Sequence, residues 1–371
     1  MKARLYLADS LKPDSPLFEI YLTHLLESIV SKGDLHESGS THERDVELAA
    51  REIVELLPPL ATVVSLLDSD SYLYQDASIR RLYREAWFNM VVHGISTHLG
   101  IGQDHASELR VFAMHSPPLV AEDRADQFES EIELNTVLRR GMSPPHTAEQ
   151  KRRLISTLPR CESDIRSLSY PKVIFLSAAY LVEILRADAG RSIQILPYFL
   201  DPSLNGSAME NCMIAITDEV MGVFLASTLD AYQKVNSAPH VAKQLAFMFT
   251  GCCHRIVRVQ QVAASCAGKI ISRMPSALCQ KSSLFALLEL LTIMWTSCLD
   301  GELDEYDWKS VYTSARGNVS VNLSDDYSLR RDTLDAFYKK AKAWVMTVIN
   351  IAPLDVKGLL QVRKKGLNLM I

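Results

Sequence analysis

Apolar residues recur at intervals of three and four along most of this chain, which is the spacing of amphipathic α-helices. The pattern is strongest in residues 281–361, where two periodic helices flank a polar connection and a proline introduces a third helix. The first of these helices is predicted to end near Gly301, and its apolar stripe holds Leu284, Leu287, Leu288, Leu291, Trp295 and Cys298. In the second helix Ser324 is the predicted N-cap. Its predicted buried face holds Leu334, Phe337, Tyr338, Ala341, Trp344, Val345 and Val348.

The same spacing predicts helices upstream, separated by breaks that contain proline or glycine. Ser15 and Pro16 have the form of an N-cap and a first helical position. Thr147 and Gln150 have the spacing of a capping box. The predicted helices cover residues 17–30, 43–57, 76–98, 151–158, 173–190, 209–232, 240–250 and 254–272, and a charged run with few apolar positions covers 122–139.

Strand signals are few. Residues 173–175 are β-branched or aromatic, but the helical spacing continues well past the usual length of a strand, so a helix is favoured. Residues 319–323, with the sequence VSVNL, could form a short extended piece without a partner strand. Two architectures remain open from the pattern, a closed all-α globule and an open stack of helix pairs. A HEAT-like solenoid tolerates the lack of a fixed-period repeat, because each helix pair needs only an apolar face for its neighbour.

Composition supports a globular chain with a large core. The chain has 371 residues, of which 48% are hydrophobic. A net charge of −5 and an isoelectric point near 6.1 leave no strong basic field, so nucleic acid is not an expected partner. No apolar run reaches the roughly 18–20 residues that a membrane span needs, and the first residues lack a signal-peptide pattern, so a soluble chain is expected.

The seven cysteines are an odd number and lie mostly in apolar helical runs, which favours a reducing compartment over a disulfide framework. Without a secretory signal, no glycosylation is expected at the sequons of Asn205, Asn318 and Asn322.

Four groups of residues invite a chemical interpretation, and in each the structural one is favoured. Adjacent thiols and an imidazole could bind zinc or act as a nucleophile, but their spacing matches no common zinc motif. An acidic group could bind a cation, but it lacks the twelve-residue spacing of an EF-hand loop. The remaining histidines lack partners at useful spacing, and the tryptophans lie on apolar stripes where packing is expected. The thiols and the imidazole are those of Cys252, Cys253 and His254, and the acidic group is Glu302, Asp304, Glu305 and Asp307. The histidines and their neighbours are Thr41, His42, Glu43, His93 and His98, and the tryptophans are Trp87, Trp295 and Trp344.

No glycine-rich phosphate loop or kinase motif occurs in the sequence. The basic residues Arg363, Lys364 and Lys365 are fewer than the four to eight typical of a lipid-binding cluster. The sequence therefore assigns no catalytic, cofactor-binding or metal-binding residue and no cofactor. A stand-alone all-α enzyme would require clustering of His254, Cys253 and a carboxylate in a cleft.

Four strings between residues 281 and 361 resemble the type III alpha phosphatidylinositol 4-kinases. They are KSSLFALLELLTIMWTSCLDGELDEYDWKS, SARGNVSVNLSDDYSLRRDTL, KAKAWV and NIAPLDVKGLLQ. The last is particularly specific, because helix formation does not demand it. The resemblance implies an all-α, HEAT-like or irregular α-solenoid of stacked antiparallel helices that lies before the kinase domain. Residues 1–371 would form one continuous segment with a softer boundary near 140–146.

The resemblance also implies a function. The full-length enzyme would make phosphatidylinositol 4-phosphate from phosphatidylinositol and ATP, with ATP and Mg²⁺ bound in a kinase domain outside this chain. This region would contribute to homodimerisation and would dock a tetratricopeptide-type scaffold subunit that acts with a lipid-modified membrane anchor. The chain would then be cytoplasmic and reach the plasma membrane only through these partners. The alternative is an independent cytosolic α-solenoid adaptor.

The family-like sequence ends at Gln361, and residues 362–371 are expected to be a non-native or disordered tail. Val362 and Arg363 can be encoded by GTA-AGA, which matches an intron donor read as exon. We therefore expect the chain to be a fragment, which sequencing the transcript across the codon of Gln361 would test.

Overall fold

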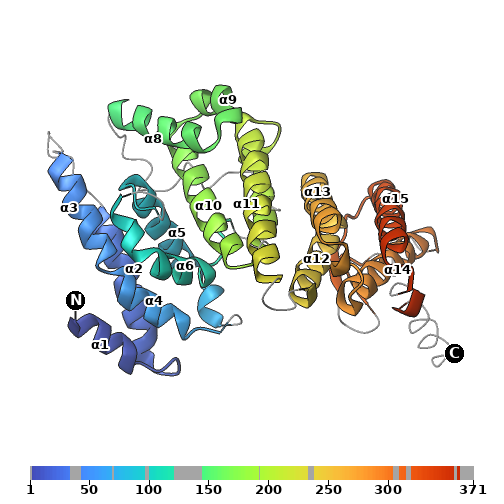
Figure 1. Cartoon of the computed structure of the whole chain (residues 1–371), viewed down its shortest axis with the longest axis horizontal. Helices are drawn as coiled ribbons and strands as arrows, with labels where there is room; N and C mark the ends of the chain where they lie inside the picture. Colours follow the sequence, from blue (N-terminus) through green and yellow to red (C-terminus); the bar gives the residue numbers. More distant parts are fainter. Residues whose placement is uncertain are drawn as a thin grey trace. The chain divides into compact units, whose positions relative to one another are not determined.

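The computed structural model of the chain describes residues 2–33, 43–68, 71–96, 100–120, 144–191, 193–232, 238–303, 309–314, 319–354 and 357–359 (Figure 1). Helices form most of this part, and its extended structure is two strands of three residues each. The all-α prediction is confirmed. The chain divides into two compact units, the first formed by Met1–Gly190 with Asp201–Val220 and the second by Arg191–Leu200 with Met221–Ile371.

The helices of the first unit pack mainly on helices that are not next to them in the sequence. Helix α2 packs on α5, α1 and α6 pack on α4, and α10 packs on both α5 and α6. In chain order the helices are α1 (Lys2–Ser10), α2 (Pro16–Gly33), α3 (Glu43–Val54), α4 (Leu57–Ser65), α5 (Ala77–Val92), α6 (Ala106–Met114), α8 (Pro144–Thr157), α9 (Glu162–Ser167) and α10 (Tyr170–Asp188). The 3-10 turns are η1 (Tyr72–Tyr74), η2 (Gly100–His105), η4 (Pro159–Cys161) and η6 (Pro202–Leu204).

An aromatic stack joins α5 to α6 in the core of the first unit. The ring of Phe112 stacks on Trp87 with a centroid distance of 4.7 Å and on Tyr83 with one of 5.4 Å. All three side chains are fully buried. The indole Nε1 of Trp87 donates to Ser116 Oγ at 2.9 Å, which satisfies its one polar group.

A buried arginine holds α10 to the end of α6. Arg186 is 2% exposed, and its Nε donates to the carbonyl of Ala113 at 2.9 Å. Its Nη2 donates to the carbonyl of Ser116 at 2.5 Å, and its Nη1 pairs with Glu183, which is fully buried on the preceding turn of α10. Buried charge is tolerated only when it is paired and hydrogen-bonded, and Arg186 meets both conditions.

The second unit is built around α12 and α13, which pack on each other (Figure 1). Helix α14 packs on α12, and α15 packs on α14. Gly251 lets two elements approach α12, because a Cβ there would lie 2.6 Å from Leu196 Cδ1 and 2.9 Å from Ala263 Cβ. The elements are η5 (Ile193–Leu200), α12 (Ala238–Cys252), α13 (Val257–Arg273), η7 (Pro275–Ala277), α14 (Lys281–Leu303), β1 (Val311–Thr313), β2 (Ser320–Asn322) and α15 (Tyr327–Ile351), while α11 (Ala208–Tyr232) contributes to both units.

The two strands form an antiparallel hairpin between α14 and α15. Tyr312 pairs with Val321 at its centre, and both side chains point inward and are buried. The prediction that VSVNL has no partner strand is therefore wrong. Its partner Val311–Thr313 lies in the polar connection, where one buried tyrosine between two exposed residues gives too short an alternation to recognise.

Three details of the predicted helix ends are also wrong. Ser324 does not cap α15; Asp326 does, because its Oδ1 accepts from the amides of Ser328 at 2.8 Å and Leu329 at 3.3 Å. Thr147 is not an N-cap, because α8 already begins at Pro144. Residues 2–10, for which no helix was predicted, form α1.

Two helices have the length and hydropathy of a membrane span, Ala208–Leu229 and Lys281–Glu302. Within the structure 50% and 56% of their most apolar windows are buried, as in the core helices of a globular protein. Length and hydropathy alone therefore assign neither helix to a membrane. The prediction of one continuous segment stays a prediction; the boundary near 140–146 falls largely, and the tail 362–371 wholly, outside the described residues.

Candidate functional site

The adjacent thiols and imidazole at the end of α12 serve the fold. The main-chain amide of Ile256 donates to His254 Nδ1 at 3.0 Å, and Gln260 Nε2 donates to the carbonyl of His254 at 2.6 Å. Burial, with a smaller contribution from Arg255, lowers the pKa of His254 to about 4. Burial raises the pKa of Cys252 to about 12 and that of Cys253 well above its usual value. Thiols with raised pKa values are poor nucleophiles and poor metal ligands at neutral pH.

The acidic group after α14 lies mostly outside the described residues, which include only Glu302 of its four members. Glu302 accepts a hydrogen bond from the hydroxyl of Tyr327 at 2.5 Å. Across the part of the chain that the structure describes, no three His, Cys, Asp or Glu side chains are grouped so that they could hold a metal ion. All seven cysteines are free thiols, and all but Cys279 are buried.

Two of the predicted packing residues have structural contacts. His93 is buried, and its Nε2 lies 3.1 Å from the carbonyl oxygen of Gly33 at the end of α2. Trp87 is in the aromatic stack described above. Residues Thr41, His42, His98, Arg363, Lys364 and Lys365 lie outside the described residues, as does the sequon of Asn318.

The other two tryptophans differ from each other. Trp344 packs on Phe249 of α12, with ring centroids 5.4 Å apart. Trp295 is 60% exposed and Leu299, one turn later, is 41% exposed, so the predicted burial of Trp295 is wrong. Tyr338 was also predicted to be buried and is 55% exposed. Helix α14 is apolar on nearly all its faces, and the elements of the second unit cover only the face that holds Leu287, Leu290 and Met294.

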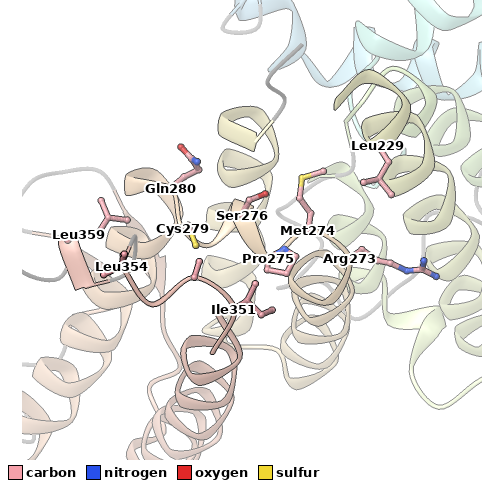
Figure 2. A pocket seen from close by; sticks show the side chains of 12 residues that line it. Leu229, Arg273, Met274, Pro275, Ser276, Cys279, Gln280, Ile351, Leu354 and Leu359 are labelled. Atoms are coloured by element: carbon pink, nitrogen blue, oxygen red, sulfur yellow. The ribbon is translucent and has the colours of Figure 1, made fainter. Parts of the chain in front are cut away.

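The second unit holds a groove with a volume of about 840 Å³ (Figure 2). Two helix ends create it. Met274, with φ −137° and ψ 73°, leaves the helical region after α13, and Ala352, with φ −136° and ψ 66°, does the same after α15. Each precedes a proline, which disfavours the helical conformation in the residue before it. The chain therefore turns away at both points and leaves a hollow.

The groove is lined mainly by apolar side chains. Figure 2 shows Met274 in the middle, Leu229 on one side and Leu354 with Leu359 on the other. Met274 is 4% exposed and forms the floor, whereas Leu354 is 82% and Ile351 61% exposed. The polar lining residues are Arg273, Ser276 and Gln280. Its described lining holds one thiol, that of Cys279, and no carboxylate or histidine that could act together with it. A groove of this kind can bind an apolar surface.

Sequence reasoning did not predict this groove, although it singled out the string that forms one wall. Ile351, Leu354, Gly358 and Leu359 belong to NIAPLDVKGLLQ. The two prolines after predicted helices were a further signal. Neither the segment around Pro275 nor the one around Pro353 contains a sequence signal that the two come together in the fold.

Comparison with known proteins shows that this chain is similar in sequence to part of a family of lipid kinases. The family model described as the PI4-kinase N-terminal region matches residues 101–368. The chain is 31% identical over 352 residues to phosphatidylinositol 4-kinase STT4 of Saccharomyces cerevisiae, and 30% identical over 341 residues to phosphatidylinositol 4-kinase stt4 of Schizosaccharomyces pombe. These alignments cover 94% and 92% of this chain. The chain spans 18% of the length of each relative.

Proposed function

Because the chain belongs to the family of PI4-kinase N-terminal regions, we propose that it is a non-catalytic helical platform within a phosphatidylinositol 4-kinase. The full-length enzyme would phosphorylate phosphatidylinositol with ATP, and ATP and Mg²⁺ would be bound by its kinase domain. This region would act by packing helix faces against partners. It would affect lipid phosphorylation only by bringing the kinase domain to its substrate.

The observation that carries this proposal is the extent of the similarity. It runs along 94% of this chain and yet takes up 18% of a phosphatidylinositol 4-kinase. Exposed apolar side chains on the second unit provide further support, since contiguous apolar surface commonly marks an interaction site. The face of α14 that holds Trp295 and Leu299 and the groove beside Leu354 are two such surfaces.

The partners we propose are a second copy of the protein, a tetratricopeptide-type scaffold subunit and, through that subunit, a lipid-modified membrane anchor. Such an assembly would keep the chain in the cytoplasm and at the periphery of the plasma membrane. α-Solenoids suit this role, because stacked helices present extended surfaces to other proteins.

Affinity purification of the full-length protein from its own cells tests this function. We expect the scaffold subunit and the anchor to be recovered with it. A version lacking residues 281–361 should recover less of both and less membrane-bound enzyme. As a control, both versions should phosphorylate phosphatidylinositol in detergent micelles, which would show that the kinase domain is folded.

Partners unrelated to lipid kinases, recovered with a protein that has no kinase activity, would overturn this proposal. They would favour an independent α-solenoid adaptor instead. Equal membrane recruitment of the two versions would also contradict the platform function.

A further inference from the structure

The end of α5 leaves one carbonyl to be satisfied from outside the helix. Gly94 follows the helix in the left-handed conformation, with φ 71°, and its amide donates to the carbonyl of Val91 at 2.9 Å. The amide of Ile95 donates to the carbonyl of Met90 at 2.9 Å, which completes a Schellman motif. This motif does not reach the carbonyl of Val92, the last residue of α5.

Gln150 of α8 supplies a donor to that carbonyl. Its side chain is 2% exposed, and its Nε2 donates to the carbonyl of Val92 at 3.1 Å. The same Nε2 lies 3.2 Å from Nε2 of His146, one turn earlier on α8. An amide nitrogen has two hydrogens and accepts no hydrogen bond, so Gln150 must donate to both partners. His146 Nε2 is therefore the acceptor, and the imidazole is neutral with its hydrogen on Nδ1.

A proton on His146 is incompatible with these two hydrogen bonds. An imidazolium carries a hydrogen on each ring nitrogen, so its Nε2 would face the N–H of Gln150. Rotating the carboxamide of Gln150 by half a turn would give His146 an acceptor, but the amide oxygen would then face the carbonyl oxygen of Val92. Protonation therefore removes at least one of the two hydrogen bonds in either orientation of the carboxamide.

The surroundings of His146 favour its neutral form. Burial lowers its pKa, the charges of Arg153 on α8 and His93 on α5 lower it further, and Glu149 on α8 acts in the opposite direction. From α10 the ring centroid of Tyr170 lies 6.1 Å from that of His146, and burial raises the pKa of this tyrosine, so it stays neutral. His146 also lies in the first turn of α8, where the helix dipole disfavours a cation.

We propose that the hydrogen bonds of Gln150 to Val92 and His146 form a pH-sensitive latch, which holds the start of α8 on the end of α5 while His146 is neutral and releases it when His146 is protonated. A released histidine binds a proton below pH 6.5 that the held one does not, so the latch is closed above pH 6.5 and weakens as the pH falls below it. This response to acid goes beyond the platform function and does not depend on it.

Hydrogen exchange measured by mass spectrometry on the 371-residue chain tests the latch. The variant is His146→Gln, whose amide oxygen can accept from Gln150 but does not titrate. Peptides from residues 148–157 should be equally protected in the wild type and the variant at pH 7. At pH 5 the wild type should be about five- to thirtyfold less protected than the variant, because this pH is about 1.5 units below the ordinary pKa of histidine. Comparison at one pH cancels the intrinsic dependence of exchange on pH.

A second variant removes the shared donor. Gln150→Met should lower the protection of the same peptides about three- to tenfold at pH 7, as expected for the loss of a buried hydrogen bond. It should also abolish the additional loss at pH 5, since no contact remains for the proton to break. The matched control is His24→Gln on α2, where the histidine is exposed, and it should behave as the wild type at both pH values.

Equal protection of the wild type and His146→Gln at pH 5 would overturn the inference, and so would unchanged protection of Gln150→Met at pH 7. If His146→Gln does not fold, Gln150→Met decides alone, because an acid-dependent loss that persists in it must come from another group. All these outcomes concern α8, whereas the platform function is tested by membrane recruitment, so the failure of one is distinguishable from the failure of the other.

Discussion

Arg186 shows how much a single side chain can organise in a helical core. Its guanidinium reaches the carbonyl of Ala113 in the last turn of α6 and that of Ser116 just beyond the helix. It also pairs with Glu183 on its own helix. The carbonyl of Ala113 also accepts from the amide of Ser116 at 3.4 Å. Carbonyls at a helix end lack part of their intrahelical donors and must be satisfied when they are buried. The arginine therefore acts as the C-terminal cap of a helix to which it does not belong.

Removing this cation should be among the most destabilising single changes in the chain. Arg186→Met removes the cation that pairs with a buried carboxylate and the side chain that donates to two carbonyls, so we expect a loss of about 3–5 kcal/mol in the free energy of unfolding. Urea unfolding followed by circular dichroism measures this loss, and hydrogen exchange over α6 and α10 localises it. Arg186→Met combined with Glu183→Leu should lose less, because the buried carboxylate is removed together with its cation.

The matched control is Arg110→Met, which removes an exposed pair with Asp188 at 2.5 Å. Exposed pairs contribute about 0–1 kcal/mol, so this variant should remain near the wild type. Equal effects of Arg186→Met and Arg110→Met would contradict the role of Arg186.

His254 gives the chain a defined response to pH. Its pKa falls from 6.5 to about 4, chiefly because of burial, and its Nδ1 accepts a hydrogen bond only when the ring is neutral. Below pH 6.5 the unfolded chain binds a proton that the folded chain does not, so the stability contributed by the neutral ring is present above 6.5 and is lost as the pH falls toward 4.

His254→Asn tests this, because an asparagine oxygen can still accept from Ile256 but does not titrate in this range. Between pH 7 and pH 5 the wild type should lose roughly 1–2 kcal/mol more unfolding free energy than the variant. Parallel losses in the two proteins would show that His254 is not the group responsible.

Helices could be predicted from spacing, but the face that each one buries could not. Helix α2 begins at Pro16 and ends at Gly33, as Ser15, Pro16 and the terminal glycine indicated. Helix α14 also forms where predicted, and Leu284, Leu287 and Cys298 of its predicted stripe are buried, yet Trp295 of the same stripe is 60% exposed. When a helix is apolar on nearly every face, its sequence does not indicate which face the neighbouring helices cover.

Two substitutions on α14 separate its faces. Leu290→Ala removes a fully buried side chain and should cost about 2–5 kcal/mol of unfolding free energy. Trp295→Ala removes a larger side chain that is 60% exposed and should change it by less than about 0.5–1 kcal/mol. Chemical unfolding of both variants measures the difference, and a larger loss for Trp295→Ala would mean that its face is covered.

For the whole molecule, the family was predicted from the resemblance of four sequence strings, and the fold class was predicted from the spacing of apolar residues. The strings between residues 281 and 361 identified a phosphatidylinositol 4-kinase region that the match to residues 101–368 now confirms. The groove could not be predicted, because Pro275 and Pro353 are 78 positions apart and only the folded chain brings Met274 near Leu354. The hairpin was missed for the same reason, since pairing is not visible in either strand alone.

The platform function predicts that this chain has no lipid kinase activity of its own. Incubation with phosphatidylinositol, ATP and Mg²⁺ should yield no phosphatidylinositol phosphate, while a full-length family member under the same conditions serves as the positive control. Product formed by this chain at a rate above background would contradict the assignment of a non-catalytic role.

The place of η5 in the sequence affects how the protein is made. Ile193–Leu200 packs on α12 and α13, where Ile195, Leu196, Tyr198 and Phe199 are buried. The ribosome must add 73 residues after Leu200 before α13 ends at Arg273, since 273 − 200 = 73. At a translation rate of about 5–20 residues per second, this apolar segment stays without its packing partners for roughly 4–15 s. During synthesis this apolar segment is therefore expected to be exposed until α12 and α13 have formed.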